Sequence, residues 1–161
     1  MAEQTSNRNL IVELSTLFGV GRFPFLQGTV AAAAGCVLYY LLFQSNLLFI
    51  IFTVVVVIVS VPISSYAEKF FGVKDPKQIV IDDFAGMCLA LIFVPHSLFY
   101  IFSAFIFFRI FDGLKVYPIN RIEKVRGGWG VSGDDIVAGI YANLLFHISS
   151  GIASLISSRG V

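Results

Sequence analysis

The sequence predicts an all-α membrane protein: a single-domain bundle (1–161) of about five transmembrane helices. Three observations lead to this prediction. Hydrophobic residues make up 57% of the 161 residues, and charged residues only 13%, about half the usual share of a soluble domain. A chain of this length has too small a core to bury so much apolar surface away from water. The apolar residues also fall into long runs separated by polar segments, as membrane-spanning helices do.

The first elements follow from the amino-terminal third of the chain. Residues 1–27 are mixed in polarity and predict a cytoplasmic or interfacial segment without a cleaved signal peptide. Apolar residues at helical spacing from Leu10 to Phe18 predict a short amphipathic helix within it. The first apolar run, Thr29 to Phe43, contains four consecutive alanines, which allow close helix approach. The second run, Leu47 to Ile63, is rich in Val and Ile.

The region from Phe84 to Phe111 decides the topology. As one helix it would be about 42 Å long, too long for a hydrocarbon core of about 30 Å. Pro95–Ser97 near its middle predicts a hairpin turn instead. Both polar segments, residues 66–83 and 112–135, then return to one face. The last apolar run, 136–156, is the fifth predicted crossing.

The hairpin places ten of the eleven Lys and Arg residues, Arg8 included, on one face and leaves Arg159 on the other. The positive-inside rule makes the first face cytoplasmic. The net charge of +1 argues against a nucleic-acid partner. Cys36 and Cys88 lie in apolar runs without metal-ligand spacing, so we expect packing residues.

A glycine-bearing loop, residues 19–29, leads into the first apolar run through Gly28 and Thr29. Free backbone N–H groups at a helix amino terminus suit an anionic phosphate. Glycine-rich patterns are weak motifs, however, and a flexible entry loop explains this one better on spacing alone.

Two further segments contain adjacent aspartates at the start of an apolar run, Asp82-Asp83 and Asp134-Asp135. Adjacent carboxylates there repel each other and lose hydration, which favours a cation beside them. Mg²⁺ prefers a few carboxylates together with water and phosphate oxygens. Helix capping explains either pair alone. Two pairs on one face make a shared metal site the better explanation.

Arg109, Asp112 and Lys115 lie between the two pairs at i, i+3 and i+6, and share one face if the helix continues that far. A salt bridge between Arg109 and Asp112 is the simple structural explanation. His147 lies in the last apolar run and is expected to pack, and His96 is expected on the opposite side of the membrane from the aspartates.

These motifs, in this order, resemble the bacterial phosphatidylglycerophosphatase A family, from about Gly19 to Tyr141. The matching strings are Gly28-Thr29, Ile79–Asp83, Phe108–Asp112 with Lys115 and Pro118, and Gly127-Gly128 through Asp134-Asp135 to Ala138-Gly139. The resemblance implies a Mg²⁺-dependent, multi-pass enzyme of the bacterial inner membrane. Such an enzyme removes phosphate from phosphatidylglycerophosphate to give phosphatidylglycerol in phospholipid biosynthesis, with its active site on the cytoplasmic face.

The resemblance maps the family's site onto Asp82, Asp83, Asp112, Lys115, Asp134 and Asp135. Our hypothesis divides these and their neighbours into three groups. The predicted metal ligands are Asp82, Asp83, Asp134 and Asp135; the phosphate-binding residues are Arg109, Lys115, Gly28 and Thr29; and the catalytic residues are Asp112, Lys115 and Asp135. The role of Asp112 stays open between metal ligand, general base and nucleophile.

The chain departs from the family pattern in the glycine loop, where Phe25 and Gln27 replace a Lys and a Pro and leave Arg22 as the nearby cation. Asp83 stands where the family usually has Glu. Two alternative functions are compatible with parts of the pattern. A phospholipid-headgroup transferase would carry an Asp-Gly-x-x-Ala-Arg signature, which Asp112-Gly113 only begins. A membrane transporter or scaffold would distribute its carboxylates across the membrane depth, whereas these all lie near helix ends.

Overall fold

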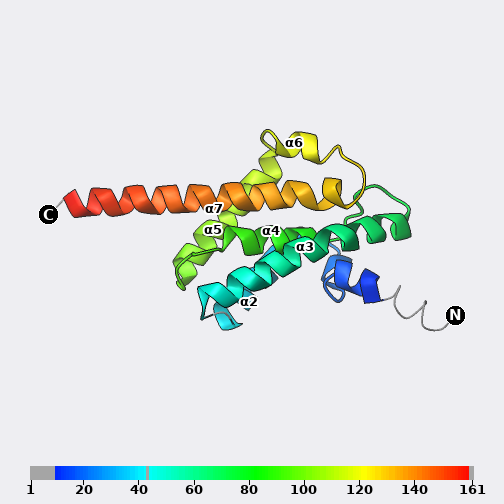
Figure 1. Cartoon of the computed structure of the whole chain (residues 1–161), viewed down its shortest axis with the longest axis horizontal. Coiled ribbons are helices and arrows are strands. Elements are labelled where there is room, and N and C mark those ends of the chain that lie inside the picture. The colour runs from blue at the N-terminus through cyan, green and yellow to red at the C-terminus, as the bar shows by residue number, and fades with distance from the viewer. Residues whose placement is uncertain (1–9, 43, 160–161) are drawn as a thin grey trace.

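The computed structural model describes residues 10–42 and 44–159, and all regular elements in these ranges are helices (Figure 1). Residues 1–9, with Arg8, lie outside the described ranges, as does the side chain of Arg159. Residues 10–15 are helical, inside the predicted amphipathic stretch. The elements that follow are η1 (Val20–Arg22), α2 (Gln27–Leu42), α3 (Asn46–Phe71), α4 (Ile81–Ala90), α5 (Leu98–Leu114), α6 (Ile119–Ile122) and α7 (Gly128–Arg159). The all-helical prediction is confirmed.

Two of the described helices, α3 and α7, are long and apolar enough to cross a membrane. The apolar helix α2 is shorter, with 16 residues, and α5 has 17. Helix α4 has only ten residues, about 15 Å of length, so it ends within the bundle. The structure therefore supports a helical bundle with two candidate spans, and five crossings stay a prediction.

The charged loops gather at one end of the bundle. In Figure 1, α2, α4 and α7 begin and α3 ends toward the right, and α5 rises from the lower left to end beside α6. The end of α5 and the starts of α2 and α4 contribute to one cavity. The α2–α3 and α4–α5 connections lie at the opposite end. The predicted hairpin is present, because α4 and α5 run in opposite directions on either side of residues 91–97. This arrangement brings the sequence-distant polar segments together.

Helix α4 forms the centre of the bundle, and most of its side chains are buried between α2, α3, α5 and α7. Its backbone touches that of α7, since a Cβ atom on Gly139 would lie only 2.2 Å from the carbonyl oxygen of Gly86. Such contact requires glycine. Cys88 is buried in this core and Cys36 packs against it, both as free thiols.

The carboxyl end of α4 is held by side chains of α7. The amide of Asn143 donates to the carbonyls of Ala90 and Ile92, at 3.1 and 2.8 Å, and Nε2 of His147 lies 3.0 Å from the Ile92 oxygen. Helix ends leave carbonyls without intrahelical partners, and such groups are costly away from water. His147 is exposed at this edge, so it contacts the α4–α5 turn rather than packing in the core.

Tyr39 of α2 holds the rest of the turn. Its hydroxyl donates to the carbonyl of Val94, and its ring lies 4.3 Å from that of His96. Tyr39 is near the end of α2, so the α4–α5 turn lies beside the carboxyl end of α2. His96 accordingly lies at the end of the bundle away from the charged loops.

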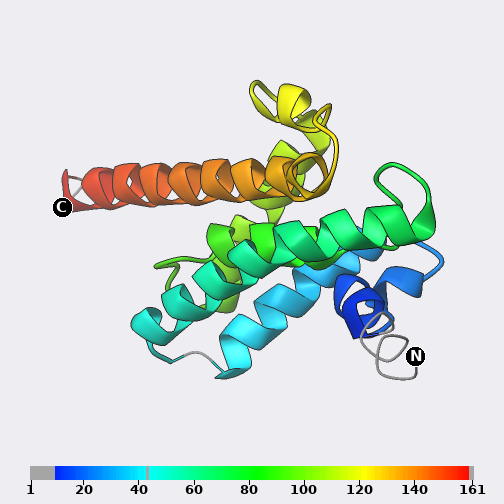
Figure 2. The same ribbon diagram turned by 45° about the vertical axis from the view of Figure 1, so that its right-hand side comes forward.

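Helix α7 extends well beyond its neighbours (Figures 1 and 2). From 147 to 158 its residues are exposed apart from the half-buried Ser150. The exposed side chains include Ile148, Ile152, Leu155 and Ile156, a surface suited to lipid.

Candidate active site

A polar cavity of about 230 Å³ lies where the helix ends meet. Residues from α2, α4, α5, α7 and the loop before α4 line it: Gln27, Gly28, Asp75, Lys77, Ile79, Asp82, Asp83, Arg109, Asp112, Lys115, Val131, Asp134 and Asp135. All five aspartates of the predicted site are among them, with both predicted phosphate-binding cations and Gly28. Thr29 is not among the lining residues, and its phosphate-binding role stays a prediction.

The cavity contains an excess of acidic groups. Six aspartates line it, against the three cationic side chains of Lys77, Arg109 and Lys115. Burial raises the pKa of Asp82 well above its usual range, and the neighbouring charge of Asp83 raises it further. The same burial raises the pKa of Asp83 to about 7, although Arg109 acts to lower it. Without an added cation the cavity favours protonated carboxyl groups.

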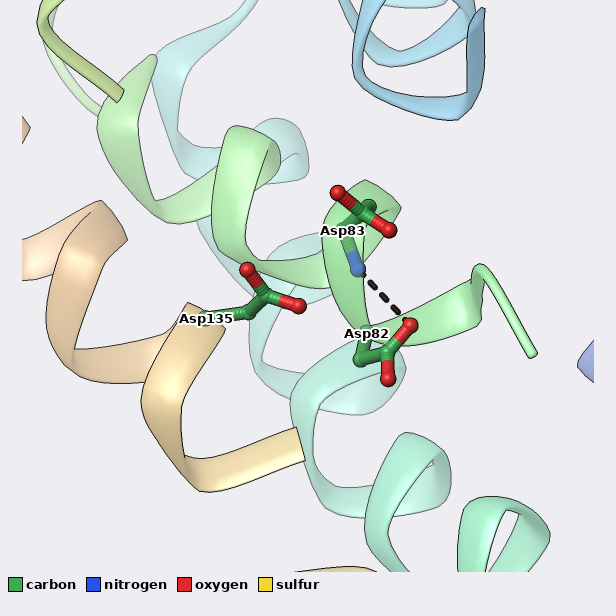
Figure 3. A group of neighbouring side chains, drawn as sticks. All are labelled: Asp82, Asp83 and Asp135. Atoms are coloured by element: carbon green, nitrogen blue, oxygen red, sulfur yellow. Dashed lines mark hydrogen bonds between the residues drawn. The ribbon is translucent and has the colours of Figure 1, made fainter. Parts of the chain in front are cut away.

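Three carboxylates form a cluster suited to a metal ion. Asp82 and Asp83 lie in the first turn of α4, and Asp135 lies beside them on α7 (Figure 3). Each offers one oxygen, and these oxygens lie within 4.8 Å of one another. An oxygen of Asp82 accepts the backbone N–H of Asp83 at 3.0 Å. Oδ1 of Asp135 is buried and has no hydrogen-bond partner among the described residues, so the donor set fits a bound cation.

The second aspartate pair does not begin a helix, which corrects the sequence-based interpretation. Helix α7 starts at Gly128, six residues before Asp134. It can do so because Gly128 packs directly on α3: a Cβ there would lie 1.8 Å from the carbonyl oxygen of Val61. The helix dipole and capping act only within the first turn. Capping therefore does not explain Asp134 and Asp135.

Arg109 connects two of the aspartates. Its Nη1 lies 2.8 Å from Oδ1 of Asp83 and 2.8 Å from Oδ2 of Asp112. The salt bridge expected between Arg109 and Asp112 is confirmed. The Arg109 side chain is 29% exposed and lines the cavity, so it pairs with both carboxylates and still presents surface to the cavity.

Lys115 lies just past the end of α5 in a left-handed conformation, with φ 45° and ψ 49°. The helix therefore does not continue through it. Its Nζ lies 3.0 Å from Glu123 and 3.4 Å from Oδ2 of Asp134. Asp134 thus pairs with a lysine, apart from the three-carboxylate cluster. Strained backbone is often retained at functional positions. The left-handed conformation of Lys115 places its ammonium group at the cavity.

Gly28 allows α2 to begin directly against Asp83. A Cβ at Gly28 would lie 2.3 and 2.4 Å from the two carboxylate oxygens. The amino terminus of α2, with its free N–H groups, consequently faces the cavity. Arg22 does not supply the cation missing from this loop, because it forms an exposed ion pair with Glu13 and does not line the cavity.

Three charged residues of this site were not predicted from the sequence. Asp75 and Lys77 line the cavity from the loop before α4, and Glu123, just after α6, forms an ion pair with Lys115. All three lie in polar loops, where charged residues are expected in any case. No spacing signal distinguishes them from ordinary surface charges.

Comparison with known proteins identifies relatives over most of the chain. The family model of phosphatidylglycerophosphatase A matches residues 13–150. A Bacteroides thetaiotaomicron protein described as a candidate phosphatidylinositol-3-phosphatase is 34% identical over 149 residues, covering 87% of this chain and 93% of the relative. No solved structure matches the chain.

Two relatives are described as phosphatidylglycerophosphatase A. The Escherichia coli protein is 33% identical over 139 residues, covering 84% of this chain and 81% of its own length. The Haemophilus influenzae protein is 35% identical over 138 residues, covering 83% and 85% respectively.

Proposed function

Because the chain belongs to the phosphatidylglycerophosphatase A family and is a phosphatase, we propose that it hydrolyses phosphatidylglycerophosphate to phosphatidylglycerol and phosphate with Mg²⁺, in phospholipid biosynthesis. One observation carries the proposal for the metal. The cavity holds six aspartates against three cations, and a phosphate monoester is itself anionic. Substrate binding there requires additional positive charge.

The three clustered carboxylates fit a magnesium ion. Asp82, Asp83 and Asp135 would hold it, since their oxygens converge and one oxygen of Asp135 has no other partner among the described residues. When bound, Mg²⁺ supplies charge neutralisation of phosphate oxygens and lowers the pKa of a coordinated water. Asp134 lines the same cavity and would act through Lys115, with which it forms an ion pair; its predicted role as a metal ligand stays a prediction.

The chain's own cations would position the phosphoryl group. Lys115 and Arg109 both line the cavity, and each is held by two carboxylates. Lys115 pairs with Glu123 and Asp134. Arg109 pairs with Asp83 and Asp112. Anchored cations keep their position and lose little freedom when they bind phosphate oxygens.

Asp112 is the carboxylate best placed to act on the attacking group. It lines the cavity, lies outside the three-carboxylate cluster, and is held by Arg109. We propose that it accepts the proton of the attacking water. Direct attack by Asp112 on phosphorus is the other possibility, and a trapped aspartyl phosphate would demonstrate it.

We further propose that the bundle is embedded in the inner membrane with the cavity at its cytoplasmic end. Helices α3 and α7 are long enough to cross, and α2 and α5 expose Leu, Val, Ile and Phe side chains. The charged loops lie together at the cavity end (Figure 1), as the positive-inside rule expects of a cytoplasmic face.

Purified protein in detergent tests the activity. Phosphate release from phosphatidylglycerophosphate is measured with Mg²⁺ and with EDTA, beside the double variant Asp82→Asn with Asp134→Asn. We expect release that requires Mg²⁺ and is lost in the variant. Phosphatidylinositol 3-phosphate serves as a parallel substrate, because the Bacteroides relative is described by that activity. Failure of the wild type to release phosphate from phosphatidylglycerophosphate would refute the proposal.

A further inference from the structure

We propose that an apolar groove between α2 and α5 binds an acyl chain of the lipid substrate; this inference rests on the proposed function. The groove has a volume of about 530 Å³, within the range of ligand sites. It is lined by Ala33, Cys36 and Val37 from α2 and by Leu98, Ile101, Phe102 and Phe105 from α5. Apart from the thiol of Cys36, these side chains are hydrocarbon.

The groove and the polar cavity are lined by the same two helices, α2 and α5. On α2, Gly28 lines the cavity and Ala33, five residues later, lines the groove. On α5, Arg109 lines the cavity and Phe105, four residues earlier, lines the groove. At 1.5 Å per residue these steps are about 6 to 8 Å. Phe105 and Arg109 also share one face of α5, because they are four residues apart. This face therefore leads from the phosphate site to the groove.

The groove is open on the side that would face lipid. Ala33, Val37, Leu98 and Phe102 are exposed, whereas Ile101 is buried and forms the floor. A lipid chain could thus enter sideways from the bilayer without leaving an apolar environment. The small side chain of Ala33 creates space opposite the aromatic rings of α5.

Two other seams of the bundle, between α3 and α7 and between α4 and α7, are closed by direct contact. Gly128 lies against the backbone of Val61, and the hydroxyl of Ser132 donates to that of Ser64 at 2.9 Å, which joins α7 to α3. Helices α4 and α7 meet in backbone contact at Gly139. The α2–α5 side therefore offers the chain of a lipid a path to the phosphate site.

The test measures how hydrolysis depends on acyl-chain length. Dibutyryl and dioleoyl phosphatidylglycerophosphate are compared in one detergent for the wild type, Ala33→Trp, which fills the groove, and Ala153→Trp. Ala153 is the matched control because it is an exposed alanine on the part of α7 that lies beyond the bundle. Thermal unfolding confirms that each variant is folded.

We expect kcat/KM of the wild type and Ala153→Trp to be higher for the dioleoyl substrate. Ala33→Trp should lose about 10-fold or more on this substrate, the effect of about two buried methylene groups, and keep its activity on the dibutyryl one. Equal losses on both substrates, or no loss on either, would overturn the groove proposal. A wild type that hydrolyses both substrates equally well would also overturn it while leaving the proposed function intact. Hydrolysis of neither by the wild type would instead refute the function.

Discussion

Replacing Gly28 with alanine would test the geometry of the site with a single methyl group. The new Cβ would lie 2.3 Å from one oxygen of Asp83, where ordinary contact begins at 3.4 Å. The carboxylate or the start of α2 must therefore shift by about 1 Å. The shift would disturb the 2.8 Å contact between Asp83 and Arg109. Misplacement of catalytic groups by about 1 Å costs on the order of 100-fold in rate.

We expect Gly28→Ala to lower kcat/KM for phosphatidylglycerophosphate by about 100-fold and to raise the Mg²⁺ concentration needed for half-maximal activity. The matched control is Gly113→Ala, because a Cβ at this glycine of α5 meets nothing within 4 Å. Alanine is favoured over glycine in a helix by about 1 kcal/mol, so neither variant should unfold earlier for reasons of helix propensity.

Gly28 could serve to donate its backbone N–H to phosphate or to make room for Asp83, and these two explanations predict different results. Alanine keeps the backbone N–H, so a residue that served only to donate this group to phosphate would tolerate the change. A residue that makes room for Asp83 would not. Activity of Gly28→Ala within about twofold of the wild type, with Gly113→Ala likewise unaffected, would refute the close-approach argument.

Three further predictions concern the metal, the α4–α5 turn and pH. Asp135→Asn should raise the Mg²⁺ concentration for half-maximal phosphate release by at least about 10-fold, the usual cost of disturbing even outer residues of a metal site; an unchanged Mg²⁺ titration would exclude Asp135 as a ligand. Asn143→Leu removes the side-chain partner of the Ala90 carbonyl and one of the two partners of the Ile92 carbonyl, which keeps His147. It should destabilise the protein by about 1–3 kcal/mol, seen as earlier thermal unfolding in detergent; an unchanged midpoint would contradict it. In EDTA, thermal stability should fall as pH rises from about 5 to 8. The folded protein keeps the Asp83 proton up to about pH 7, whereas the unfolded chain releases it near pH 3.9, so the folded state binds more protons. Added Mg²⁺ should restore thermal stability more strongly at pH 8 than at pH 5. Thermal stability that rises with pH in EDTA would contradict this prediction.

The convergence of the charged segments was predictable from the sequence. A 28-residue apolar region with proline near its middle is too long for one crossing, and a turn there returns Asp112 to the side of Asp82. The salt bridge of Arg109 with Asp112 followed from i, i+3 spacing and is present. Composition and periodicity are enough for these features because they depend on local geometry and on the length of each run.

The end of α4 was not predictable in the same way. Residues 91–94 are apolar and continue the pattern of a helix, yet α4 ends at Ala90, five residues before Pro95. The groups that make this end possible come from helices far along the chain, Asn143 and His147 of α7 and Tyr39 of α2. A hydrogen bond between distant segments leaves no local pattern in the sequence.

The start of α7 and the different partners of Asp134 and Asp135 also depend on contacts between distant segments. Gly127 and Gly128 precede a polar stretch that favours a loop by composition, but contact between Gly128 and α3 allows the helix to begin there. Asp134 and Asp135 are neighbours in sequence and look equivalent. Their positions on the helix direct one to Lys115 and the other to the α4 cluster, which only the three-dimensional arrangement decides.

The capping of α4 by α7 has a consequence for how this protein is made. The ribosome delivers α4 and its turn well before Asn143 emerges, so the carbonyls of Ala90 and Ile92 lack this side-chain partner until α7 is made. We therefore expect chains that stop before Asn143 to be less stable than longer ones, because the carbonyls at the end of α4 depend on a side chain that is made later.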